Sequence, residues 1–128
     1  MPVEIPADKM ADYREMARRR HEREQAQLRA QLQAREALAW QLARRAAQLL
    51  KENFGASRVA VFGSLVQPGM FSLHSDVDLA AWGIAPEDTF RAIGAVYDLS
   101  SEIELNLVDV AVARPSVYRA ILEQGVDL

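Results

Sequence analysis

The sequence predicts an α/β fold in which helices pack against a small mixed β-sheet of three main strands, with a long α-helix in front. Two short apolar runs, Val59 to Phe62 and Val77 to Trp82, are rich in β-branched or aromatic residues and are bounded by turn-forming residues, as strands are. A third run, residues 104–111, is apolar on both faces, which predicts a central strand. Upstream, residues 8–53 contain neither Gly nor Pro, and Ala, Arg, Gln, Glu and Leu dominate, which is typical of a long helix.

Length and composition narrow the class of protein. A chain of 128 residues, half of them hydrophobic, has room for one domain with a single modest core. No run approaches the roughly 18 apolar residues that cross a membrane, and the first residues lack the apolar core of a signal peptide. The absence of cysteine excludes disulfides and thiolate metal sites. We therefore expect a cytoplasmic protein with no membrane association.

The long helix has two halves of different character. The second half carries a mainly apolar stripe from Leu28 to Leu49, at alternating spacings of four and three residues, so it has a face to bury. In the first half the same stripe is charged and polar, so it has no face to bury on its own domain. We therefore divide the chain into residues 1–35, a leader and projecting helix, and residues 36–128, the folded domain. Residues 1–7, with two prolines, are expected to be extended.

The first half of the helix leaves two alternatives open. It is either solvated, with charge pairs four residues apart, or packed on a partner or on a second copy of the chain. Its arginines, at residues 18–20, are diluted by neighbouring glutamates, and no aromatic ladder accompanies them. The sequence therefore does not favour a nucleic-acid partner.

Turn-forming residues place the remaining elements. Gly55 is suited to a left-handed cap at the end of the long helix, and residues 64–70 to a short helical turn. Pro86 and Pro115 each mark the first turn of a helix, and Gly125 ends the second of these. Apolar periodicity predicts that the inward faces of these two helices are Phe90, Ile93 and Tyr97, and Val117, Tyr118, Ile121 and Leu122.

Two acidic residues at the start of the second strand are the candidate metal ligands. Alternation along a strand puts Asp76 and Asp78 on the same side, at the rim of an apolar face. Two such charges about 5 Å apart repel by roughly 3 kcal/mol at an effective dielectric near 20, which a cation would relieve. Oxygen ligands of this kind suit Mg²⁺ with substrate phosphates completing its shell. Gly63 and Ser64, after the first strand, can supply backbone N–H groups and a hydroxyl to a phosphate.

At these residues the chain resembles the minimal nucleotidyltransferases (MNT) of the DNA polymerase β superfamily. The resemblance rests on Phe62-Gly63-Ser64 followed by Ser75-Asp76-Val77-Asp78-Leu79, and it spans residues 36 to 128. It implies a palm-like nucleotidyltransferase fold and Mg²⁺-dependent transfer of adenylate from ATP, with Asp76 and Asp78 as metal and catalytic residues. It also implies nucleotide binding by Gly63, Ser64 and Ser75.

The resemblance further implies a partner. Family members of this size often act as antitoxins that inactivate a small HEPN ribonuclease toxin by adenylylating a tyrosine. We therefore expect a protein acceptor of this kind beside the nucleotide triphosphate. The half of the chain that holds the acid pair is itself acidic, with 4 Lys or Arg against 10 Asp or Glu from residue 53 onward. Metal and nucleotide are thus expected to bind together.

The third strand departs from the family pattern. The family places a third carboxylate there, and the alignment puts Asn106 at that position; an amide can donate an oxygen ligand but cannot accept the proton. Asp109 points to the opposite face of a regular strand and reaches the site only through a bulge or the strand end. Glu104 shares the face of Asn106 one pleat away and is the other substitute.

Two function hypotheses follow from this strand. In the first, the protein is an active adenylyltransferase, with Asp109 or Asn106 completing the catalytic set of Asp76 and Asp78. In the second, it is a catalytically weakened antitoxin that neutralises its partner by binding alone. The intact Gly-Ser and Asp-x-Asp motifs favour the first, and Asn106 favours the second.

Overall fold

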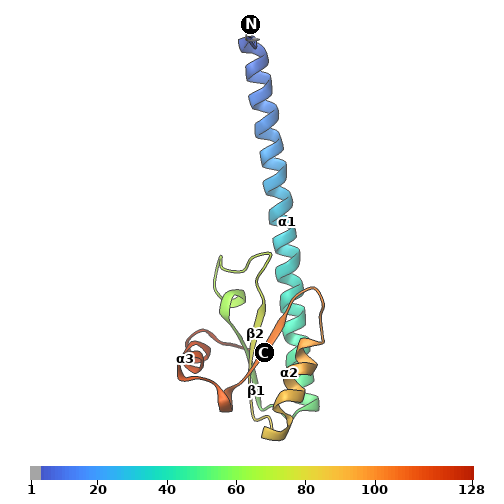
Figure 1. Cartoon of the computed structure of the whole chain (residues 1–128), viewed down its shortest axis with the longest axis vertical. Coiled ribbons are helices and arrows are strands. Elements are labelled where there is room, and N and C mark those ends of the chain that lie inside the picture. The colour runs from blue at the N-terminus through green and yellow to red at the C-terminus, as the bar shows by residue number, and fades with distance from the viewer. Residues whose placement is uncertain (1–3) are drawn as a thin grey trace. The chain divides into compact units, whose positions relative to one another are not determined.

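The computed structural model describes residues 4–128, so the first three residues of the expected leader lie outside it (Figure 1). The chain divides into two compact units, one up to Ala34 and the other Arg35–Leu128. The boundary falls within one long helix, α1 (Ala7–Asn53). In the part of the chain that the structure describes, no helix has the length and apolar character needed to cross a membrane.

The first unit is a helix whose side chains are exposed. Glu15 pairs with Arg18 and with Arg19, the latter at 3.0 Å, and Arg20 pairs with Glu24 at 3.4 Å. Exposed pairs of this spacing add little to helix stability. Tyr13, Met16 and Leu28 are also largely exposed in this stretch.

The second unit is built on a four-stranded mixed sheet, which confirms the predicted α/β class. The strands are β1 (Arg58–Phe62), β2 (Val77–Trp82), β3 (Leu105–Asp109) and β4 (Val126–Asp127), in the order β3-β2-β1-β4. β1 is antiparallel to both β2 and β4, whereas β3 is parallel to β2. The prediction that the third strand is central is wrong, because β3 lies at the edge. The apolar residues on both faces of β3 reflect the helices that cover both faces of the sheet. Such a pattern does not require a neighbouring strand on each side.

Helices cover the sheet on two sides (Figure 1). The last part of α1 and helix α2 (Thr89–Tyr97) lie on one side, and helix α3 (Pro115–Gln124) on the other. The α1 residues buried in the core are mostly alanines, so the helix backbone lies close to its neighbours. They are Ala39, Leu42, Ala43, Ala46, Ala47 and Leu50. The core under α3 consists of Phe62, Ala80 and Ile121, with Trp82, Val108, Val110 and Val117 packed against it.

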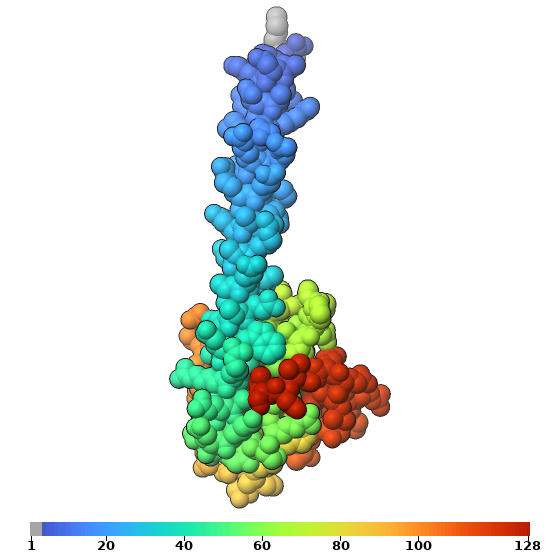
Figure 2. Space-filling view, turned by 180° about the vertical axis from the view of Figure 1, so that it is seen from behind, coloured from blue at the N-terminus to red at the C-terminus, as the bar shows by residue number. Residues whose placement is uncertain are grey.

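The end of α1 and the C-terminus of the chain lie close together in the second unit. Gly55 has φ of 69°, as the predicted left-handed cap requires, and the chain then turns into β1. At the other end, the backbone N–H of Leu128 donates to the carbonyl of Val59 at 2.9 Å. Lys51 Nζ donates to the carbonyl of Leu128 at 2.6 Å. Figure 2 shows the C-terminal residues lying against the final turns of α1.

The predicted inward face of α2 is wrong. Ala92 and Val96 are the buried residues of this helix, whereas Phe90 is 88% exposed and Tyr97 52% exposed. A 3-10 turn, Pro86–Asp88, precedes α2, which starts at Thr89. The helix carries a second apolar stripe of smaller residues, Ala92 and Val96, four positions apart, and this stripe is the one that packs.

The predicted inward face of α3 is correct only in part. Ile121 is buried and Val117 packs on the core, but Tyr118 and Leu122 are exposed. The predicted helical turn after β1 is a 3-10 turn over Gly63–Val66, shorter than expected.

Removal of residues 1–24 is predicted to leave the melting temperature of the second unit within a few degrees of the full chain. The reason is that every buried apolar residue that the structure describes lies at Ala39 or beyond. Scanning calorimetry measures this, and analytical ultracentrifugation of the same sample reads out self-association. As a control, removal of residues 1–44 takes away Ala39, Leu42 and Ala43, and is expected to abolish the cooperative transition.

Candidate nucleotide and metal site

The turn after β1 is seated against a carboxylate of β2. Gly63 has φ of 80°, and a Cβ atom built on it would lie 2.7 Å from Oδ2 of Asp78. Only glycine satisfies both the backbone conformation and this close approach. The 3-10 turn that follows is closed by a bond from the N–H of Gln67 to the carbonyl of Ser64, at 3.3 Å. The structure therefore brings the Gly-Ser turn and the second acid of Asp-x-Asp together.

The strand register brings the acid pair and the amide to one place. Asp78 is paired with Phe62 of β1 on one side and with Asn106 of β3 on the other. Nδ2 of Asn106 lies 3.5 Å from Oδ2 of Asp76 and 3.2 Å from Oε2 of Glu104. Asp76, which immediately precedes β2, and Asp78 thus share the sheet face of Asn106. The lateral order across the sheet is the Gly63 turn, then Asp78, then Asn106 with Glu104.

Electrostatics at this cluster favour a cation. Burial raises the pKa of the Asp78 carboxyl above its usual range, and repulsion from Asp76 and Glu104 adds to the shift, while the amide of Asn106 opposes it. Carboxylate and amide oxygens are the donor set that Mg²⁺ prefers. Among residues 4–128, no three or more His, Cys, Asp or Glu side chains are arranged to hold a metal by themselves. Asp76 and Asp78 supply two carboxylates at this place, so a Mg²⁺ ion here would need further oxygen ligands, such as nucleotide phosphates.

Asp109 is not brought to this site. It is 4% exposed, lies opposite Ala81, and accepts hydrogen bonds from Thr89 Oγ1 at 2.7 Å and from the N–H of Ala111 at 3.0 Å. Strand alternation places it on the face of Leu105 and Leu107, under α2. Its carboxylate therefore joins the end of β3 to the start of α2. The expectation of a catalytic role for Asp109 has no geometric support.

The hydroxyl of Ser75 makes hydrogen bonds within the loop, and its expected contact with the nucleotide stays a prediction. Ser75 Oγ accepts a bond from the N–H of Ser72 at 2.9 Å and lies 3.1 Å from the Ser72 hydroxyl. The N–H of His74 also donates to the Ser72 hydroxyl, at 3.2 Å. These bonds fix the loop that leads into Asp76, so Ser75 positions the acid rather than pointing free into the site.

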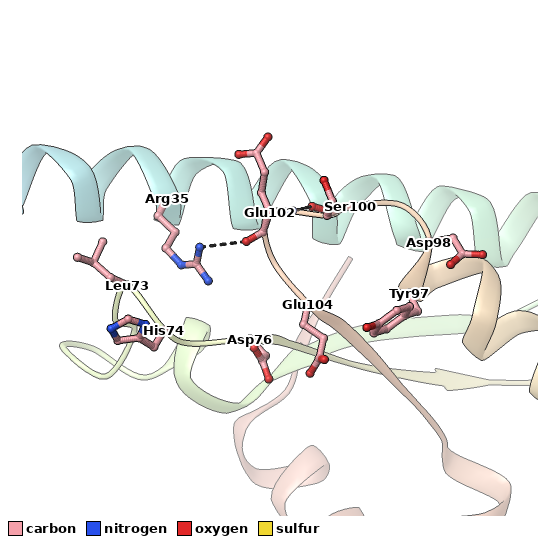
Figure 3. Close-up of a pocket in the computed structure, with 10 residues that line it drawn as sticks. Arg35, Leu73, His74, Asp76, Tyr97, Asp98, Ser100, Glu102 and Glu104 are labelled. Carbon is pink, nitrogen blue, oxygen red and sulfur yellow. Dashed lines mark hydrogen bonds between the residues drawn. The ribbon is translucent and has the colours of Figure 1, made fainter.

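A cleft of about 800 Å³ lies beside Asp76, the first acid of the pair (Figure 3). Arg35 of α1 fixes two of its walls, because its guanidinium donates to the carbonyl of Ser75 at 3.0 Å and to that of Glu102 at 3.3 Å. The residues that line it are Arg35, Leu73, His74, Asp76, Tyr97, Asp98, Ser100, Ser101, Glu102 and Glu104. Of these ten residues, the sequence pointed only to Asp76 and Glu104 as site residues. Tyr97 was expected in the core, and for Arg35, at the end of the expected projecting segment, the charge was the one available signal.

Comparison with known proteins supports the fold that the motif predicts. No family model and no curated protein sequence matches the chain. Solved structures do match. One is the toxin-antitoxin MntA-HepT, with 16% identity and a TM-score of 0.52 over 69% of this chain and 69% of that chain. Another is a toxin-antitoxin with AMP-PNP, with 21% identity and a TM-score of 0.52 over 62% and 66%.

A third match is a tri-AMPylated Shewanella oneidensis HEPN toxin in complex with MNT antitoxin, with 17% identity and a TM-score of 0.52 over 70% of both chains. These likenesses show the fold alone, that of a small α/β domain. Its particular fold is that of the MNT antitoxins, as the Gly-Ser and Asp-x-Asp pattern predicted.

Proposed function

We propose that this protein is a Mg²⁺-dependent nucleotidyltransferase that moves adenylate from ATP to a hydroxyl group of a partner protein. The observation that carries the proposal is the seating of Gly63 against Asp78, with Asp76 and Asn106 on the same face of the sheet. A phosphate-binding turn next to an oxygen-only acid pair is the arrangement that Mg-nucleotide chemistry needs.

The residues have distinct roles in this proposal. Backbone N–H groups after Gly63 and the Ser64 hydroxyl bind the outer phosphates. Asp76 and Asp78 would hold the metal, and the amide nitrogen of Asn106 contacts Asp76. When bound, Mg²⁺ would neutralise negative charge on the phosphates and on the leaving pyrophosphate. In the transfer step the acceptor oxygen forms a bond to the α-phosphorus. The bond from that phosphorus to the bridging oxygen breaks, and pyrophosphate leaves.

The acceptor proton needs a base, and Glu104 is the residue best placed to take it. Asn106 has no proton-accepting group, and Asp109 lies on the other face of the sheet. The carboxylate of Glu104 lies 3.2 Å from the amide of Asn106, which also contacts Asp76. Asn106 thus positions Glu104 relative to the acid pair. In this proposal Glu104 takes the place of the third carboxylate, two residues before the position of Asn106.

The proposed partner is a HEPN-type toxin, with this chain as its antitoxin. Support comes from the matched structures, which hold an MNT antitoxin with a HEPN toxin, and in one case an AMPylated toxin. The second candidate function, neutralisation by binding alone, is favoured by the amide of Asn106 at the expected carboxylate position. In that case the nucleotide is at most structural.

Intact-mass spectrometry of the partner toxin tests the proposal. The toxin is co-expressed with the wild-type chain and with an Asp76→Asn/Asp78→Asn variant, and both toxin samples are weighed. We expect adenylate adducts on a tyrosine with the wild type and none with the variant. If the toxin is silenced equally by both and carries no adduct, the binding-only function is correct.

A further inference from the structure

We propose that the cleft beside Asp76 is the acceptor site and that it takes a basic protein segment, with a Lys or Arg side chain next to the reacting hydroxyl. This inference rests on the proposed transfer reaction and names its substrate class. Three observations carry it: where the cleft lies relative to the phosphate turn, which charges line it, and which aromatic side chain it exposes.

The first observation is position. In phosphoryl and nucleotidyl transfer the attacking and leaving oxygens are roughly in line, on opposite sides of the phosphorus. The turn at Gly63, which binds the leaving phosphates, is on one side of Asp78, and Asn106 and Glu104 are on the other. Asp76 and Glu104 line the cleft, whereas Gly63 and Ser64 do not. The attacking hydroxyl therefore approaches from the cleft.

The second observation is charge. Four acidic residues line the cleft, namely Asp76, Asp98, Glu102 and Glu104. Figure 3 shows the carboxylates of Asp76 and Glu104 close together, whereas the Glu102 carboxylate points away from them. Arg35 is the main opposing charge, and its guanidinium is engaged by the carbonyls of Ser75 and Glu102. A cleft with this balance attracts a cationic segment and repels an acidic one.

The third observation is an aromatic ring in the same cleft. Tyr97 is 52% exposed although its neighbour Val96 is completely buried, so the helix directs the ring away from the core. An exposed tyrosine face near carboxylates binds a guanidinium or ammonium group by cation–π attraction as well as by charge. The ring and the acids thus favour the same ligand chemistry.

Peptide binding measured without ATP tests the cleft separately from catalysis. The probes are two fluorescein-labelled peptides with a central phenylalanine in place of the acceptor tyrosine, one flanked by arginines and one by glutamates. Fluorescence anisotropy is measured with the full chain, the double variant Asp98→Lys/Glu102→Lys and the matched control Glu87→Lys/Glu123→Lys. The control makes the same change in net charge at exposed positions outside the cleft.

We expect the arginine peptide to bind the wild type and the control alike, and to bind the cleft variant roughly tenfold more weakly. Tyr97→Ala should weaken binding, and Tyr97→Phe should retain it. The milder variant Asp98→Asn/Glu102→Gln, checked by circular dichroism, gives the same direction if the lysine variant fails to fold.

Three results would overturn the assignment: equal binding of both peptides, equal loss in the cleft variant and the control, or no binding of the arginine peptide. A loss of Mg-ATP affinity in Tyr97→Ala with peptide binding unchanged would instead place the nucleobase in the cleft. Failure of the proposed function is a different result, namely peptide binding as expected but no adenylate transfer to the matching tyrosine peptide.

Discussion

Asp78→Asn is expected to abolish most Mg-ATP binding while raising the melting temperature of the nucleotide-free protein. The loss should exceed the roughly 10- to 100-fold that follows from removing a residue that only supports a metal ligand. The gain in stability has a separate cause. A carboxyl whose pKa is raised in the folded state holds its proton more tightly there than in the unfolded chain. Stability therefore falls as pH rises through that raised pKa, and the neutral amide removes the penalty.

Calorimetric titration of Mg-ATP and scanning calorimetry of the same samples check both halves of this expectation. Glu123→Gln, an exposed acid on α3, is the control and should change neither. Wild-type affinity should also fall on acidification at a higher pH than for an ordinary aspartate, because metal binding needs the ionised form. Equal ATP affinity with excess chelator would contradict a metal-dependent site.

Glu104→Gln is expected to lower the transfer rate by roughly 10²- to 10⁴-fold, the usual effect of losing a general base, with Mg-ATP affinity almost unchanged. Asn106→Asp in that background should restore much of the rate, because it returns a proton acceptor to the face of Asp76 and Asp78. Transfer from labelled ATP to the co-purified toxin is the measurement. The base limb of the pH–rate profile should move in the rescued variant, which a merely structural role would not produce.

The Asp109→Asn variant tests which face of β3 carries the catalytic base. We expect it to lower thermal stability, because it weakens the bonds to Thr89 and Ala111, and to leave transfer by the folded protein largely intact. A folded Asp109→Asn variant without transfer, together with an active Glu104→Gln variant, would place the base at Asp109 and contradict the proposal.

The sequence was informative where a local pattern decides the structure. The apolar runs at β1 and β2 and the cap at Gly55 are local signals, and strand alternation alone placed Asp109 on the face away from the acid pair. The edge position of β3 was not predictable in this way, because it follows from β3 pairing only with β2, and no local pattern says which strands pair. Tyr97 was misplaced because α2 has two apolar stripes, and the buried one consists of the smaller residues Ala92 and Val96.

No local sequence pattern reveals the two hydrogen bonds of Arg35, because their acceptors lie 40 and 67 residues away in the chain. One partner, Ser75, directly precedes Asp76, and the other, Glu102, lies two residues before Glu104. The planar guanidinium of Arg35 thus fixes the distance between the segments that carry Asp76, the proposed metal ligand, and Glu104, the proposed base. Lysine at this position would keep the charge but could not bridge both carbonyls with one rigid planar group. A residue of α1 that takes no part in the proposed reaction thus holds Asp76 and Glu104 at their separation.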